Sequence, residues 1–384
     1  MTLRRLLLVA LLAIASGGLA GHAHAAGPAM TLGVAEDAVR APDLPTAEAK
    51  MAQLRLAGFT AVRVTTNWAP GLTAPDADEL RELRNVETAA DLNGVEVYVS
   101  VYNVGQRTTP LDPIAQSQFA QYAASVARLL PTFDQIIVGN EPNLNRFWLP
   151  QFGPGGENVS AAAYLRLLAA THDAVKATAD DVRVWGGATA PRGADRPGAG
   201  RETTSPTTFI RALGAAYRRS GRDRPVMDGF VHHPYPESSA VPIDLPHPRV
   251  RSIGVADYDK LVRLLGDAFD GTAQKGSDLP ILYGEIGVET TIPAAKQALY
   301  TDREIARTIS ERAQSAAYRR VLELASCQPN VAGVLFFHLL DEPSLVGWQS
   351  GVRYVDGSPK TSLAAVHAAA GDAAAGRLDV HCGS

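Results

Sequence analysis

Short apolar runs alternate with longer amphipathic segments along most of this chain. Residues 136–138 are β-branched without polar alternation, which is typical of a strand covered on both faces. Residues 117–130 have the spacing of an amphipathic helix, and Pro131 follows them. These two patterns predict strands at 30–36, 60–66, 95–102, 136–138, 183–188, 227–232, 281–286 and 331–337 and helices at 45–57, 76–93, 117–130, 160–179, 207–220, 258–269, 304–326 and 363–370.

The order of these elements predicts an α/β fold. Strict alternation of strand and helix favours parallel strands joined by right-handed crossovers. Eight such units closing on themselves make a single (β/α)8 TIM barrel, and no change of composition marks a linker within residues 26–384. An open, doubly wound sheet is the alternative, but no Gly-x-Gly-x-x-Gly phosphate loop follows the first predicted strand. On a barrel, we expect the active site where the strands end and the helices begin.

The first residues have the three parts of a secretory signal. Arg4 and Arg5 precede an apolar run at 6–14, and Ala23-His24-Ala25 supplies small residues for cleavage. We therefore expect residues 1–25 to be a signal peptide and the mature protein to be secreted, or at least extracytoplasmic. The apolar run is too short to span a bilayer as a mature helix, so no membrane association is expected after cleavage.

Charge and cysteine content limit the partners further. Loss of Arg4 and Arg5 with the signal takes the formal charge from −4 to −6, which argues against nucleic acid as a partner. The chain has two cysteines, Cys327 and Cys382, and an exported protein can keep them as a disulfide. Zinc is the less expected reading, because neither cysteine lies in a two-cysteine metal spacing.

Polar and aromatic residues gather at the predicted carboxyl ends of the strands. On a barrel these ends converge on one rim, and aromatic faces beside polar groups suit the apolar faces and hydroxyls of a sugar. The alternative is that they pack and cap the barrel mouth. The candidate substrate-binding residues are Glu36, Arg63, Trp68, Asn103, Asn140, His233, Tyr235, His338 and Trp348.

Two strand-end glutamates are the candidate catalytic groups. Glu141 stands before Pro142, which has no amide hydrogen and so ends the strand at the acid. Glu285 lies 144 residues later, near the end of the seventh predicted strand. The fourth and seventh strands of an eight-fold ring face each other across its mouth. Two carboxylates about 5 to 5.5 Å apart would make hydrolysis of a glycosidic bond retaining. The alternative for Glu141 is a loop carboxylate that caps the next helix.

Several short motifs resemble those of the clan A glycoside hydrolases, the superfamily of cellulases, β-xylosidases and β-glucosidases. They are Asn140-Glu141-Pro142, Glu285-Ile286-Gly287, Arg63, and His233-Pro234-Tyr235. The likeness extends across the mature barrel and looks closest to the cellulase-like family five and to family thirty-nine. One departure is the eighth strand, which ends Phe336-Phe337-His338 where many relatives carry a tryptophan.

The resemblance implies a role for each matching residue. Glu141 would be the acid/base, and Glu285 the nucleophile of a retaining β-glycosidase. Asn140 would contact the sugar 2-hydroxyl. Arg63 and Tyr235 would hold Glu285 ionised and oriented, and His233 would line the site near the acid/base. Arg63 lies inside an apolar strand, which is costly unless it meets a carboxylate.

We expect no cofactor and no metal. His232 and His233 are adjacent on a strand, so their side chains point to opposite faces and cannot readily share one ion. The expected partner is an oligo- or polysaccharide, and the expected state is a monomer. A transglycosylase using the same two glutamates, or a barrel that binds glycans without catalysis, are the alternatives. The sugar, the linkage and endo or exo action stay open.

Overall fold

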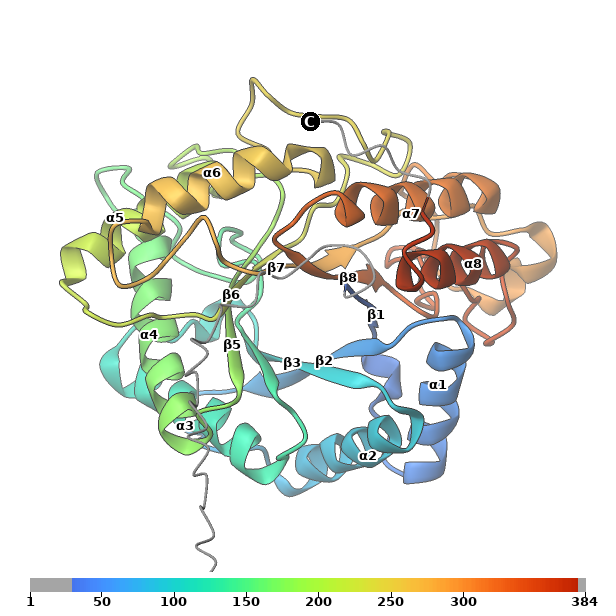
Figure 1. Ribbon diagram of the computed structural model, residues 1–384, viewed down its shortest axis with the longest axis horizontal. Coiled ribbons are helices and arrows are strands. Elements are labelled where there is room, and N and C mark those ends of the chain that lie inside the picture. Colours follow the sequence, from blue (N-terminus) through green and yellow to red (C-terminus); the bar gives the residue numbers. More distant parts are fainter. Residues whose placement is uncertain (1–29, 379–384) are drawn as a thin grey trace, which may run out of the picture.

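Eight parallel strands pair in chain order and close into a barrel, as the sequence predicts (Figure 1). The structure is a computed structural model that describes residues 30–378. Strand β1 (Thr31–Ala35) closes the ring by pairing with β8 (Val331–Phe337). The strands between them are β2 (Ala61–Trp68), β3 (Glu96–Asn103), β4 (Gln135–Val138), β5 (Arg183–Thr189), β6 (Gly229–His232) and β7 (Ile281–Ile286).

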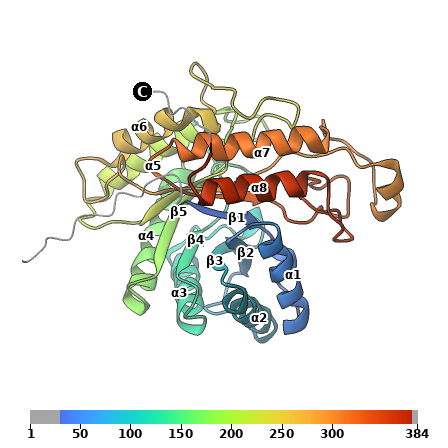
Figure 2. The same cartoon turned by 45° about the vertical axis from the view of Figure 1, so that its right-hand side comes forward.

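Eight α-helices surround the barrel within the described residues, one after each strand (Figure 1). They are α1 (Leu44–Leu56), α2 (Ala77–Asn93), α3 (Pro113–Leu129), α4 (Ser160–Thr178), α5 (Pro206–Ser220), α6 (Tyr258–Phe269), α7 (Glu311–Ser326) and α8 (Ser362–Ala374). Figure 2 shows α7 and α8 side by side over one flank of the barrel. The main apolar core lies between the strands and this ring of helices.

A second, smaller core fills the barrel itself. Its members point inward from the strands: Ala61, Tyr98, Ile137, Trp185, Ala188, Val231, Leu282 and Leu335. Trp185 is the largest, and its indole donates a hydrogen bond to Gln135 Oε1 at 2.7 Å. A Cβ at Gly229 would lie 2.3 Å from that indole, so only glycine fits opposite it. The interior is therefore packed, and the open space lies above it, at the strand ends.

Helix α7 begins later than the sequence predicts. The expected start was residue 304, but the helix starts at Glu311, where the Ser310 side chain accepts from the Ala313 amide. The preceding segment is extended, because Ile309 pairs with Thr290 in the loop after β7. A loop contact therefore overrides local helix preference here. The other element ends differ from the predictions by a few residues.

Two predictions lie outside the described residues. The signal segment 1–25 is one, so its cleavage stays a prediction. Cys382 is the other, so the disulfide between Cys327 and Cys382 also stays a prediction. Over the part of the chain that is described, no helix has both the length and the apolar character needed to cross a bilayer.

Candidate active site

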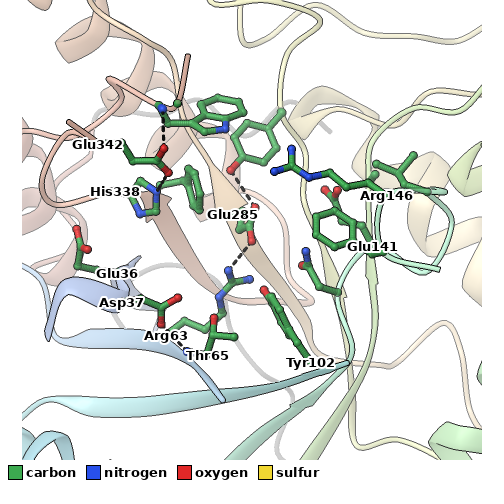
Figure 3. Close-up of a pocket in the computed structure, with 18 of the residues that line it drawn as sticks. Glu36, Asp37, Arg63, Thr65, Tyr102, Glu141, Arg146, Glu285, His338 and Glu342 are labelled. Atoms are coloured by element: carbon green, nitrogen blue, oxygen red, sulfur yellow. Dashed lines mark hydrogen bonds and ion pairs between the residues drawn. The ribbon is translucent and has the colours of Figure 1, made fainter. Parts of the chain in front are cut away.

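A cavity of about 1150 Å³ opens at the carboxyl ends of the strands (Figure 3). Its walls come mainly from the loops after β1, β4, β5 and β8. The predicted residues that line it are Glu36, Arg63, Asn140, Glu141, Tyr235, Glu285, His338 and Trp348. Residues about 300 positions apart in the chain, such as Glu36 and His338, therefore share one wall, because the strand ends meet around the ring.

Glu141 follows β4 in a backbone conformation that the surrounding structure enforces. Its φ is +38°, in the left-handed region that side chains other than glycine seldom adopt. Its amide donates to Ala188 O at 2.8 Å, which ties it to the end of β5. The Tyr164 hydroxyl of α4 donates to Val138 O and accepts from the Gly187 amide, each at 2.8 Å. Two strand ends are thus fastened together beneath the acid, and Glu141 faces the cavity.

Asn143 fixes the loop that carries Glu141. Its Oδ1 accepts from the Ala190 amide at 2.9 Å, and its Nδ2 donates to Thr204 O at 2.9 Å. The side chain is fully buried, so it acts as a bracket between the loops after β4 and β5. The neighbouring sequence does not reveal this role, because the partners of Asn143 lie about 50 and 60 residues further along the chain.

Glu285 is the penultimate residue of β7 and is buried, with 7% of its surface exposed. Arg63 of β2 forms an ion pair with its Oε1, and the Tyr235 hydroxyl donates to its Oε2 at 3.0 Å. Burial by itself raises the pKa of this carboxyl. The charges of Arg63 and His233, with the hydrogen bonds from Arg63 and Tyr235, outweigh burial and hold the pKa well below its usual range. The buried guanidinium of Arg63 is thus paired with a carboxylate, as its place inside an apolar strand requires.

His233 lies between the two glutamates. Its Nδ1 is 3.2 Å from Glu141 Oε1 and 3.6 Å from Glu285 Oε2. One ligand atom from each of these three residues lies within 4.8 Å of the others, so the two carboxylates face each other at close range. The two carboxylate oxygens, within 4.8 Å of each other, are near the spacing of about 5 to 5.5 Å found in retaining glycosidases and closer than in inverting ones.

Among the described residues, these three side chains form the group whose ligand atoms lie close enough together to hold a metal ion. Both Glu285 oxygens, however, already accept from Arg63 or Tyr235. His232 takes no part, because its ring nitrogens contact Thr189 Oγ1 at 2.8 Å and Ile253 O at 3.0 Å on the other face of the strand. The group is therefore better suited to a substrate between two carboxylates than to an ion, and the absence of a metal stays a prediction.

Asn140 has an open acceptor. The residue is 8% exposed and lines the cavity, and its Oδ1 has no hydrogen-bond partner among residues 30–378. A buried amide oxygen without a partner is costly unless a ligand supplies a donor. The hydroxyl of a bound ligand would do so.

Glu36 and His338 hold the walls together at the edge of the cavity. Glu36 Oε2 accepts from the Leu339 and Leu340 amides at 3.1 and 3.0 Å, so it joins the loop after β1 to the loop after β8. The His338 ring lies between Ala35 O at 2.6 Å and Glu342 Oε1 at 3.3 Å. Burial lowers the pKa of His338, but Glu342, Glu36 and Ala35 O together raise it above its usual value. Both residues line the cavity and also have structural bonds.

Trp348 supplies an aromatic wall. Its ring lies 4.9 Å from the Tyr235 ring and 5.5 Å from the Phe337 ring, measured between centroids. The eighth strand has no terminal tryptophan, but the loop after it brings Trp348 to the same cavity.

Trp68 and Asn103 do not line the cavity, which corrects their expected place. Trp68 is fully buried edge-on against Phe119 of α3, and its indole donates to Leu72 O at 2.9 Å. Asn103 Nδ2 donates to Gly105 O and Phe147 O at 2.8 and 3.2 Å. The physical reason for Trp68 is that successive side chains of a strand point to opposite faces. Arg63 and Thr65 of β2, at odd positions, line the cavity, so Trp68, at an even position, faces the helices.

The same alternation along the strands would have identified two cavity residues that the sequence did not bring to notice. Thr65 shares the inward face of β2 with Arg63, and Tyr102 shares the inward face of β3 with Tyr98. Arg146, Phe147, Arg192 and Glu342 also line the cavity, but they lie on long loops. No local periodicity marks a loop residue as part of a site.

No protein-family model and no curated protein sequence matches this chain. Solved structures match its fold. Bacteroides uniformis beta-glucuronidase is 12% identical over 90% of this chain and 36% of its own, with a TM-score of 0.58. An exo-beta-1,4-mannosidase from an Opitutaceae bacterium is 17% identical over 91% of this chain and 60% of its own, with a TM-score of 0.57.

A GH39 enzyme from Xanthomonas axonopodis pv. citri is 16% identical over 90% of this chain and 67% of its own, with a TM-score of 0.57. This chain thus spans only about a third of the length of the glucuronidase and three fifths of the mannosidase. At these identities the comparison concerns the fold. The chain has a closed (β/α)8 barrel, the fold that it shares with these glycosidase structures.

Proposed function

We propose that this protein is a secreted, retaining glycoside hydrolase that cleaves a β-type bond by double displacement. The observation that carries the proposal is the pair of carboxylates, Glu141 and Glu285, with oxygens within 4.8 Å across one cavity. Among the described residues, Glu285 is paired with a buried guanidinium and Glu141 is not. Two acids in unequal surroundings are what a nucleophile and a proton donor require.

Glu285 is the proposed nucleophile. Its ionised oxygen attacks the anomeric carbon from one face while Glu141 gives a proton to the departing oxygen, and the bond between sugar and leaving group breaks. Glu141 then takes a proton from water, the water oxygen bonds to the anomeric carbon, and Glu285 departs as a carboxylate. Two inversions give net retention.

The neighbouring residues fit these steps. Arg63 and Tyr235 orient Glu285 and favour its charged form. Asn140 offers its open Oδ1 to the sugar 2-hydroxyl, and Trp348 presents an aromatic face to the sugar. Substrates would be oligo- or polysaccharides, and the protein would act as an extracytoplasmic monomer without a cofactor.

The stereochemistry of the first product tests this function. We would screen aryl β-glycosides and polysaccharides from plants, fungi and bacteria, then follow a cleaved substrate by proton NMR. The β-anomer should form first, with the α-anomer appearing later by mutarotation. First appearance of the α-anomer would contradict double displacement. Binding measured by calorimetry without turnover of any glycoside would instead support a non-catalytic barrel.

The pH profile tests the role of Tyr235. Glu285 attacks only when ionised, so kcat/KM falls as pH drops through its pKa. Tyr235→Phe removes a hydrogen bond that lowers this pKa, so the pKa should rise and the acid limb should move to higher pH by about one unit. Tyr217→Phe is the matched control, because its hydroxyl donates to Arg224 O away from the cavity. An acid limb that stays in place in Tyr235→Phe would exclude the tuning role.

A further inference from the structure

The charged residues that line the cavity are divided between two sides (Figure 3). The loops after β1 and β8 carry most of the acids, and α1 adds one cation, Lys50. The loops after β4 and β5 carry two arginines, Arg146 and Arg192, and their one lining acid is Glu141. Figure 3 shows Arg146 beside Glu141, across the cavity from Glu36 and Glu342.

Protein groups already satisfy the acids. Glu36 accepts backbone amides from the loop after β8. Asp37 accepts from the Thr65 amide at 2.6 Å, and Asp341 forms a fully buried ion pair with Lys360 at 2.7 Å. Glu342 accepts from the Trp348 amide at 3.2 Å and contacts His338. These acids hold the walls in place and leave little capacity for a ligand cation.

The two arginines have no such partners. Among the described residues, neither has a carboxylate oxygen within ion-pair distance of its guanidinium. Arg146 is exposed and contacts the Phe147 ring, 5.5 Å from its centroid. Arg192 is half-buried and donates to Tyr235 O at 3.0 Å, which leaves its other N–H groups to the cavity. Burial lowers the pKa of Arg192, and the charges of Glu237 and Glu141 offset this only in part.

The position of the two arginines in the cavity indicates which part of a substrate they would contact. Glu141 must lie beside the bond that breaks, because it protonates the leaving oxygen. Arg146 is five residues beyond Glu141 on the same loop, and Arg192 follows β5, whose end accepts the Glu141 amide through Ala188. The arginines therefore border the leaving-group side of Glu141.

We propose that the leaving-group side of this cavity binds an anionic group, the carboxylate of a uronic acid or the sulfate of a sulfated sugar, through Arg146 and Arg192. The inference rests on the proposed glycosidase function and adds a substrate class to it. Guanidinium groups offer forked N–H donors that match such oxyanions, and in a half-enclosed cavity these bonds are stronger than in water. The sugar on the other side of the bond is not specified by these residues.

A matched set of three leaving groups tests this proposal. On the glycone that screening identifies, we would compare 4-carboxyphenyl and 4-sulfophenyl β-glycosides with the neutral methyl ester of the carboxyphenyl compound. Wild-type kcat/KM should favour the anionic members, and the preferred anion tells carboxylate from sulfonate recognition. Arg146→Gln should reduce the ratio of anionic to neutral kcat/KM about tenfold, with the loss falling mainly on the anionic substrates, because a charged hydrogen-bonded contact is lost. Arg146→Lys should keep part of the preference.

Controls separate this result from other effects. Arg166→Gln removes an exposed arginine of α4 that donates to Ala162 O of its own helix and does not line the cavity, so the ratio should not change. Raised salt should reduce the wild-type ratio, since exposed charges are screened. A wild-type ratio near one, or an equal loss on both substrates in Arg146→Gln, would overturn this inference and leave the glycosidase intact. Failure to cleave any glycoside would overturn the proposed function itself and the inference with it.

Discussion

Glu285→Ala should lose turnover of an activated aryl β-glycoside by on the order of 10⁴-fold or more, because no covalent intermediate can form. Added azide should restore product release, because it fits the space that the carboxylate leaves. The product should be an α-glycosyl azide, inverted relative to the substrate, since azide attacks from the nucleophile's face in a single displacement. Release of the aryl group gives the rate, and NMR gives the configuration.

Folding must be checked beside this loss, because Glu285 partners a buried guanidinium. Its removal leaves Arg63 without its ion pair, and an unpaired buried charge is destabilising. Glu285→Gln keeps the shape and the hydrogen-bond acceptor, so it should fold and remain inactive. Glu48→Ala, at an exposed glutamate of α1, is the control for simple loss of a carboxylate. Full activity in both Glu285 variants would reject this residue as nucleophile.

Glu141→Ala should have an effect that depends on the leaving group. A 2,4-dinitrophenyl group departs without a proton, so its first step should be nearly unaffected and deglycosylation should become rate-limiting. A phenyl or sugar leaving group needs the proton, and its kcat/KM should fall by about 10² to 10⁴-fold. Azide should attack the glycosyl-enzyme and give a β-glycosyl azide with retained configuration. Rates across a series of substituted phenyl glycosides measure this dependence.

The two azide products are the strongest contrast between the glutamates. Opposite configurations from the Glu285 and Glu141 variants would assign nucleophile and acid/base independently of any resemblance. The same configuration from both, or an equal loss on every leaving group in Glu141→Ala, would contradict the assignment. His233 contacts both carboxylates, so its substitution is not a clean control here.

The barrel was predictable because each unit carries its own local signals. Apolar β-branched runs predict buried strands, and the segments between them have helical spacing with caps such as Asp76 and Gly94. Eight repeats leave few topologies other than closure, since parallel strands need right-handed crossovers. The predicted start of α7 was wrong because the pairing of Ile309 with Thr290 joins two segments that are not adjacent in the chain.

The two glutamates were predictable for a related reason. A barrel places every strand end on one rim, so their positions in the chain suffice to predict that Glu141 and Glu285 meet. Trp68 shows the limit of that argument: it lies at a strand end, but its position in the strand turns it toward α3. Being at the rim and facing the cavity are separate conditions.

The sequence by itself thus determined the fold class, the strands and the two carboxylates that face each other. Periodicity and strand order can be read along the chain, and closure of the barrel then places every strand end on one rim. Only the tertiary structure decided what each side chain meets. Glu36 is bonded to the loop after β8, Asn140 keeps an open acceptor, and no carboxylate of the described chain lies within ion-pair distance of Arg146 or Arg192. These outcomes depend on contacts between residues far apart in the chain, and loops leave no periodic pattern from which such contacts can be read.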